Sequence, residues 1–468
     1  MFLIRKTLAS SLVRELGSFD SETYNYLVHD YATKYICTAI NSLWHFTIAF
    51  IDIPSSSHTK LALNLRRNDP HYISATHTNS HTLYIRVAPH VLTDHAVQVS
   101  MAIVQGQPLP GVQLIPLRVF KWVDAQGSLD SATAYRSALT ANVFAHTAAE
   151  LARICHPQNI PEHTEIVRGR VDPPNQKTVR EHGRIFELQL VSKCMSNMLE
   201  ALHARGSLRH ATQPNNLSTL VCIPGQRALR LIADEHGVVS QLAMDACVIF
   251  ELMCENDAPV IWYHFVPNSQ RYQHWKNAIR VAELAFEFTR GQQKITNMLC
   301  PVGRMAIGSP NLLTASLLSS LNLVPGGDNS LTQGQRQDLL AALHGRILST
   351  SADKCTIDEL LMDRTNCGWC LHTVHARLCH RLAAPNSQSA ATQTMPQCFV
   401  SVAFLISALP ETMYRTLDTR KTTVMLDYLI RLARTTSACL DESGPEAVLE
   451  AARIVLDLGL RIIGASPH

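Results

Sequence analysis

Cysteines and histidines gather in residues 367–380 (CGWCLHTVHARLCH). Cys367, Cys370, His375 and His380 have the Cys-x2-Cys-x4-His-x4-His spacing of a small zinc knuckle, in which thiolates and imidazoles close a tetrahedron around the ion. The apolar residues between them repeat at helical spacing, which favours an ordinary helix core. The four residues therefore define a candidate zinc site with a helix core as its alternative. A thioredoxin-like Cys-x-x-Cys pair is a third interpretation.

Cations stand beside aromatic residues in two segments, 118–122 (RVFKW) and 271–280 (RYQHWKNAIR). Such interleaving can stack nucleic-acid bases and neutralise phosphates, and it also occurs on solvated faces and at protein interfaces. We predict RNA contact at Arg271, Lys276 and Arg280. A net charge of +3 is too small for a general field around the molecule, so any RNA contact must be local.

Catalytic signatures are missing elsewhere in the sequence. His146 and Glu150 stand four residues apart on a predicted helix and could form a base and its orienting group, or simply a packing pair. There is no Gly-x-x-x-x-Gly-Lys-Ser/Thr loop, no Gly-x-Gly-x-x-Gly after a strand, no His-Glu-x-x-His and no Gly-x-Ser-x-Gly. The sequence therefore predicts a protein that is not an enzyme and that has no cofactor apart from the candidate zinc.

The elements that must position these residues predict an α+β fold. Residues 1–130 are expected to hold an N-terminal helix and a β-rich region, 131–330 a mixed α/β region, and 331–468 a helical region, all in one compact body. Helices are predicted at 20–50, 131–155, 271–289, 357–382 and 446–463, and strands at 61–65, 82–87, 97–104 and 260–265. No linker or repeat separates these regions.

Composition limits the class of protein further. The chain has 468 residues, 46% of them hydrophobic, and only 17% charged, below the roughly 25% of a free soluble domain, which predicts a surface covered by partners. Thirteen cysteines without a regular framework predict reduced thiols, and the apolar runs are too short to span a membrane. The N-terminal residues carry Arg5, Lys6 and Arg14 against Glu15, a pattern typical of an organellar presequence.

Residues 142–152 (NVFAHTAAELA) carry a resemblance to a known family. They resemble a helical stretch in the clamp (nodule) inner-capsid protein of turreted reoviruses, the orthoreovirus- and aquareovirus-like group, in which a cysteine follows as Cys155 does here. The resemblance implies a structural protein of the virion, assembled in the host cytoplasm. It implies contacts with the inner capsid shell protein, with neighbouring capsid or turret proteins and with double-stranded RNA, and none with a membrane.

The predicted function is therefore a capsid clamp that rivets the inner shell of a double-stranded RNA virus. The arginine-bearing N-terminus supports a first alternative, an organellar assembly subunit such as a mitochondrial ribosome or respiratory-complex accessory protein. The segment 367–380 supports a second alternative, a zinc- or thiol-dependent enzyme.

Overall fold

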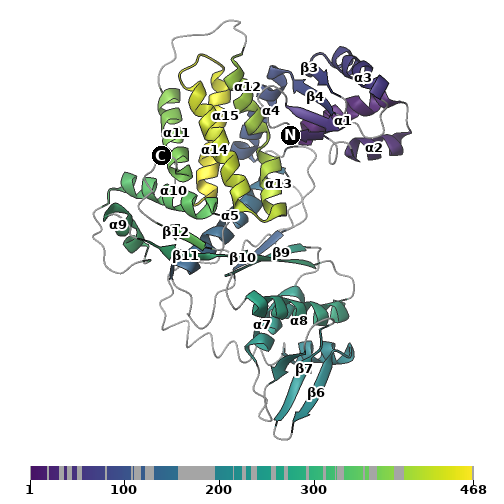
Figure 1. Ribbon diagram of the computed structural model, residues 1–468, viewed down its shortest axis with the longest axis vertical. Coiled ribbons are helices and arrows are strands. Elements are labelled where there is room, and N and C mark those ends of the chain that lie inside the picture. The colour runs from purple at the N-terminus through teal and green to yellow at the C-terminus, as the bar shows by residue number, and fades with distance from the viewer. Residues whose placement is uncertain are drawn as a thin grey trace.

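The molecule is an α+β protein, as its sequence predicts, and Figure 1 shows a helical bundle with one smaller module beside it and another below it. The computed structural model describes residues 2–17, 20–30, 36–38, 45–49, 55–79, 82–106, 109, 117–121, 131–155, 195–213, 216–223, 228–232, 240–254, 260–267, 272–290, 295–308, 312–321, 323, 331–350, 354–357, 366–383 and 395–465.

An antiparallel sheet with helices forms the N-terminal module. Its elements are α1 (Phe2–Leu16), α2 (Ser21–Asp30), β1 (Ile36–Thr38), β2 (Phe46–Ala49), α3 (Ser55–Asn68), β3 (Ile73–Thr78) and β4 (Thr82–Val87). The strands lie in the order β1-β2-β4-β3. Along β4, Leu83, Ile85 and Val87 are buried and alternate with half-buried residues, so one face of the sheet joins the core.

Helix α1 is an integral part of the fold. Its apolar residues Ile4, Leu8 and Leu12 are 1%, 1% and 0% exposed. Arg5 Nη2 lies 2.7 Å from Glu411 Oε1, which ties α1 to the helical bundle. The presequence hypothesis is not supported, because the apolar face of α1 packs into the main core, whereas a leader that is removed would not form part of that core.

A parallel sheet lies in the middle of the chain between two helices. It consists of β5 (Leu117–Lys121), β9 (Val260–Pro267) and β10 (Ile295–Val302) in the order β10-β9-β5. One face, with Phe265 and Cys300 side by side, packs against α5 (Ser131–Cys155), where the ring of Phe144 lies 4.9 Å from that of Phe265. The other face, with His264 and Leu299, lies toward α8 (Tyr272–Arg290).

The module below α8 has its own core (Figure 1). A helix at residues 195–204 and the antiparallel strands β6 (Leu208–Gln213), β7 (Asn216–Val221) and β8 (Leu229–Ile232) pack with α7 (Gln241–Cys254). The apolar face of α8 completes this second core with Trp275, Ala282 and Phe286. Helix α8 therefore has one face in a core and the other free to line a surface.

The helical bundle occupies the C-terminal part. Its helices are α10 (Gln333–Ser349), α11 (Cys367–Ala383), α12 (Gln397–Ser407), α13 (Leu409–Thr419), α14 (Thr422–Cys439) and α15 (Glu446–Ile462), joined by α4 (Pro89–Gln105). The predicted last helix is confirmed as α15, whose residues Val448, Val455 and Leu458 are at most 1% exposed. Helix α9 (Leu312–Ser320) and the parallel pair β11 (Arg304–Ile307) and β12 (Lys354–Ile357) link the bundle to the sheet.

Several predicted elements were wrong. The predicted helix 20–50 ends at Asp30 and gives way to β1 and β2, and the predicted strands 61–65 and 97–104 lie within α3 and α4. In α4 the β-branched run mimics a strand, but Pro89 in the first turn and Gly106 at φ 65° bound a helix. The predicted helix 357–382 begins only at Cys367, after β12.

No single helix in the described ranges is apolar enough over a membrane's thickness. Helices α12 and α13 together pass such a test across a bend of 47°. Both helices contribute buried residues to the core of the bundle.

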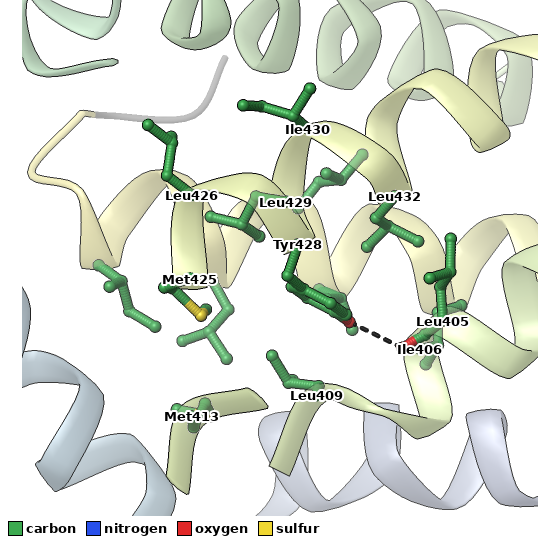
Figure 2. Packing of buried hydrophobic residues seen from close by; sticks show 14 of the residues in the cluster. Leu405, Ile406, Leu409, Met413, Met425, Leu426, Tyr428, Leu429, Ile430 and Leu432 are labelled. Carbon is green, nitrogen blue, oxygen red and sulfur yellow. Dashed lines mark hydrogen bonds between the residues drawn. The ribbon is translucent and has the colours of Figure 1, made fainter. Parts of the chain in front are cut away.

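Replacing Tyr428 with phenylalanine is expected to destabilise the bundle modestly. The Tyr428 hydroxyl donates to the buried Leu405 carbonyl at 3.0 Å (Figure 2). That carbonyl also accepts from Ala408 N, so the variant loses one hydrogen bond without leaving the oxygen unpaired, and we expect a loss of about 1 kcal/mol in chemical denaturation. Tyr414→Phe, at a side chain that is 51% exposed, is the control and should leave stability unchanged. Equal effects of the two variants would contradict the prediction.

Candidate functional site

A cavity of about 250 Å³ lies between α8, β10 and the chain that follows β7. Apolar and polar side chains share its wall: Ile223, Lys276, Ile279, Arg280, Glu283, Asn297 and Leu299. We call this space the α8 cavity. It is the place where the described structure brings two of the predicted RNA-contact residues together with polar partners.

The geometry of two elements places these side chains. Lys276, Arg280 and Glu283 follow one another at four- and three-residue spacing, so they share the face of α8 opposite the second core. Asn297 and Leu299 are two residues apart on β10 and therefore point to the same side of the sheet, toward α8. The cavity thus lies where the free face of the helix meets the edge strand.

A chain of hydrogen bonds orders the back of the cavity. His264 Nε2 lies 2.8 Å from Asn297 Oδ1, Asn297 Nδ2 donates to Glu283 Oε1 at 3.0 Å, and Arg280 Nη1 donates to Glu283 Oε2 at 3.0 Å. Burial lowers the pKa of His264 to about 4, so the ring is neutral near pH 7. Because the Asn297 amide must turn its NH2 toward a carboxylate, its oxygen faces the histidine, whose Nε2 therefore carries the proton.

The open side of the cavity is cationic. Arg280 also lies 3.6 Å from Glu287, but Arg205 holds the same carboxylate at 2.7 Å. Lys276 is exposed, and in the part of the chain that the structure describes no carboxylate forms an ion pair with it. With two cations and one acid in the wall, the cavity attracts an anionic group.

The structure describes two of the three residues predicted to contact RNA. Lys276 and Arg280 line the α8 cavity together, and Arg271 lies outside the described residues. RNA contact at these residues stays a prediction. Sequence reasoning missed His264 and Asn297, because spacing along one helix does not reveal partners on two neighbouring strands. It also missed Glu283, which the three-residue spacing from Arg280 on the same helix could have revealed.

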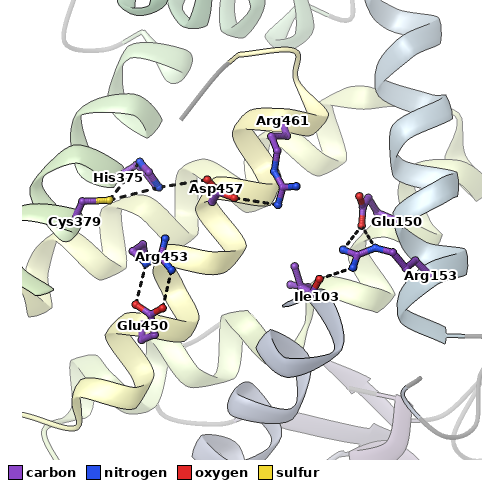
Figure 3. Close-up of polar contacts among 9 residues, drawn as sticks. All are labelled: Ile103, Glu150, Arg153, His375, Cys379, Glu450, Arg453, Asp457 and Arg461. Carbon is purple, nitrogen blue, oxygen red and sulfur yellow. Dashed lines mark hydrogen bonds and ion pairs between the residues drawn. The ribbon is translucent and has the colours of Figure 1, made fainter. Parts of the chain in front are cut away.

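The candidate zinc residues lie along one helix and do not converge. Cys367 and His380 are thirteen residues apart on α11, about 20 Å at the rise of an α-helix. In the described ranges, no group of three or more metal-binding side chains could hold an ion. His375 is 1% exposed and faces Cys379 and Asp457 instead (Figure 3). Burial raises the pKa of the Cys367 and Cys370 thiols, which disfavours a reactive thiolate.

His146 and Glu150 do not form a catalytic pair. The His146 side chain is exposed, while Glu150 forms an ion pair with Arg153, which also donates to the Ile103 carbonyl and so joins α5 to α4 (Figure 3). Phe144 from the same stretch is buried against the sheet. The residue types in 142–152 are thus explained by the packing of α5 against the sheet and α4.

A second region is marked by the parallel sheet itself. In open α/β sheets, ligands bind outside the carboxyl ends of the strands, which here are Lys121, Pro267 and Val302. Near this edge Arg136 of α5 is buried and donates to the carbonyls of Arg304 and Thr350. These bonds fix the start of α5 against β11 and α10 and give the edge a rigid border.

Comparisons with solved structures show that the fold resembles that of arginyl-tRNA synthetases. No model of a protein family and no curated protein matches the sequence. Among solved structures, the arginyl-tRNA synthetase of Thermus thermophilus matches at a TM-score of 0.62 and 12% identity, over 99% of this chain and 98% of that one. The arginyl-tRNA synthetase of Plasmodium falciparum matches at 0.60 and 8%, over 92% and 94%. A protein described as an arginyl-tRNA synthetase of Campylobacter jejuni matches at 0.55 and 13%, over 81% and 99%.

The chain therefore has the fold of an arginyl-tRNA synthetase. This fold overturns the predicted capsid clamp, together with the virion location and the capsid shell and turret partners derived from it. The expectation of a non-enzymatic protein was also wrong, since the structural neighbours are enzymes by name. Neither the organellar assembly subunit nor the zinc- or thiol-dependent enzyme gains support from them. An eleven-residue helical pattern was too short to identify a family.

Proposed function

We propose that this protein acts on tRNA as a synthetase-like enzyme that joins an amino acid to it, with arginine as the first candidate. One observation carries the proposal: the fold agrees with the Thermus thermophilus enzyme over nearly the whole of both chains. This chain contains an N-terminal module, a parallel sheet and a helical bundle. A tRNA is large enough to contact all three parts.

Exposed arginines on the helical bundle support contact with a nucleic acid. Arg431 and Arg434 lie four and seven residues after Asp427 on the exposed face of α14, and Arg377 lies on the adjoining face of α11, where it donates to Ser437 Oγ at 3.2 Å. We call Arg377, Arg431 and Arg434 the arginine strip. Arginines presented in a row on a rigid helical surface suit the phosphates of an RNA backbone.

The direct test is an aminoacylation assay. The full chain is incubated with total tRNA, ATP and radiolabelled arginine, and the ester-linked label on precipitated tRNA is counted, with each of the other amino acids in parallel. Label above that of a heat-unfolded sample supports the proposal. No label with any amino acid, from protein that is folded and binds tRNA, would overturn the charging activity.

Reversing two charges on the arginine strip is expected to weaken tRNA binding. Arg431→Glu combined with Arg434→Glu should raise the tRNA Kd at least about tenfold and lower the salt slope of log Kd by about 2, because each phosphate contact releases about one counterion. Both side chains are exposed, so the variant should fold. Fluorescence anisotropy with labelled tRNA over a salt series measures both quantities.

The matched control for this prediction carries the same charge change elsewhere. Arg209→Glu combined with Arg336→Glu alters exposed arginines on β6 and α10, two elements that do not carry the strip. We expect a smaller change in Kd and salt slope in this control. Indistinguishable effects of the two double variants would show that net charge, and not the arginine strip, controls binding.

A further inference from the structure

The α8 cavity has features that a merely solvated helix face lacks. Behind its cations lies a side chain with no exposure, His264, whose hydrogen bond to Asn297 fixes the carboxylate of Glu283 and, through it, Arg280. These hydrogen bonds use both carboxylate oxygens of Glu283. They use only part of the guanidinium of Arg280, which has five N–H donors. Arg280 is therefore held in place with donors to spare.

The size and lining of the cavity narrow the class of ligand. Its volume of about 250 Å³ is near the lower end of the range of roughly 300 to 1,000 Å³ that is typical of small-molecule pockets, so it suits a single nucleotide-sized unit and excludes a duplex. Ile223, Ile279 and Leu299 supply an apolar surface of the kind against which an extruded base packs. Lys276 and Arg280 at the open side supply the charge that a phosphate requires.

We infer that the α8 cavity binds one ribonucleotide, with its phosphate at Lys276 and Arg280 and its base against the apolar wall. The ligand is either a free nucleoside monophosphate or one unpaired nucleotide of an RNA strand, which offer the same chemistry. The inference goes beyond the proposed function, because it requires neither an amino acid nor a charging step. A chain that fails to charge tRNA can still bind a nucleotide here, and the converse also holds.

The test measures binding directly on the full chain. Isothermal titration calorimetry with AMP, CMP, GMP and UMP gives the Kd of the free nucleotide, and adenosine and inorganic phosphate are titrated as probes of each half of the ligand. A labelled single-stranded RNA and the corresponding duplex, competed with AMP, distinguish the two sources. We expect AMP to bind at least about tenfold more tightly than either adenosine or phosphate, because only AMP contacts both the apolar wall and the two cations at the open side.

Variants place the ligand in the cavity. Lys276→Ala and Arg280→Ala should each weaken AMP binding about tenfold or more, because each removes a charge-assisted hydrogen bond. Arg336→Ala, which removes an exposed arginine from α10, is the control and should leave the Kd unchanged. Thermal unfolding of each variant confirms that the fold is kept, which is expected because Lys276 is exposed.

The outcomes separate clearly. One supporting result is that AMP displaces single-stranded RNA more effectively than duplex RNA, while both cavity variants bind AMP more weakly. This result identifies an RNA strand as a source of the nucleotide. AMP binding without RNA competition supports it with the free nucleotide as the source. Absence of AMP and RNA binding, equal affinity for phosphate and AMP, or a Kd unaffected by Lys276→Ala and Arg280→Ala would each overturn it.

Discussion

Replacing Gly368 with alanine is expected to lower the free energy of unfolding by about 3 kcal/mol or more. Helices α10 and α11 approach so closely at this point that a Cβ on Gly368 would lie 1.7 Å from the Ala341 carbonyl oxygen. Gly345 on α10 meets the same place from the other side, where an added Cβ would lie 2.3 Å from Gly368 N. Both neighbours are backbone atoms of packed helices, so the clash is relieved only by separating the helices.

The prediction has a matched control in the same pair of helices. Gly334, in the first turn of α10, is exposed, and a Cβ there would meet nothing within 4 Å. Gly334→Ala should raise stability by about 0.5 kcal/mol, since alanine loses less backbone entropy on folding. Thermal and urea unfolding followed by circular dichroism measure both variants. If Gly368→Ala unfolded with the midpoint of the wild-type protein, the close approach of α10 and α11 would be wrong.

The helical part of the fold could be predicted from the sequence because its signals are local. Helix α15 has an apolar stripe whose residues recur after three or four positions, and α5 and α8 lie within one residue of their predicted bounds. Prediction failed in α4, where β-branched residues occur within a helix, and in α3, where Leu61, Leu63 and Leu65 alternate with other residues as in a strand. Such runs suit both periods. It also failed at β10 and β11, whose strand character comes from pairing with distant partners, Val260–Pro267 and β12.

The candidate site shows the same limit more sharply. Lys276 and Arg280 could be found from charge and aromatic spacing along one helix. Asn297, which lines the same cavity, comes from a strand that the parallel register alone brings beside His264, thirty-three residues earlier in the chain. The zinc hypothesis failed for the complementary reason: ligands that are close in sequence are spread along the axis once the segment is a helix.

Lowering the pH from 7.5 to 5 is expected to remove most of the stability of the fold. Burial lowers the pKa of four histidines, to about 4 for His45, His264 and His344 and to about 3 for His95. Their neutral form is consistent with the contacts, since Val87 N donates to His45 Nδ1 at 3.1 Å, which requires an unprotonated nitrogen. These side chains lie in different parts of the molecule, so their effects should add.

The direction of the effect follows from proton binding. Below about pH 6.5 these histidines are protonated in the unfolded chain but not in the folded chain. Their full contribution to the free energy of unfolding is therefore present above about pH 6.5, and it falls as the pH drops toward the folded pKa values. At pH 5 each histidine costs about 2 kcal/mol of stability, and the four together cost about 8 kcal/mol, which lies within the range of about 5 to 15 kcal/mol by which proteins are usually stable. Urea midpoints at pH 7.5, 6.5, 5.5 and 5.0 should therefore fall steeply below pH 6.5.

One variant isolates the cause of this acid sensitivity. His95 is 6% exposed, and its Nδ1 has no hydrogen-bond partner, so His95→Leu should keep the packing while removing one buried group that gains a proton on unfolding. The urea midpoint of this variant should exceed that of the wild-type protein more at pH 5 than at pH 7.5. His380→Gln, at an exposed histidine of α11, should leave the pH dependence as it is. A flat wild-type profile down to pH 5 would mean that the histidines are hydrated in the folded protein, because desolvation is the main cause of their lowered pKa values.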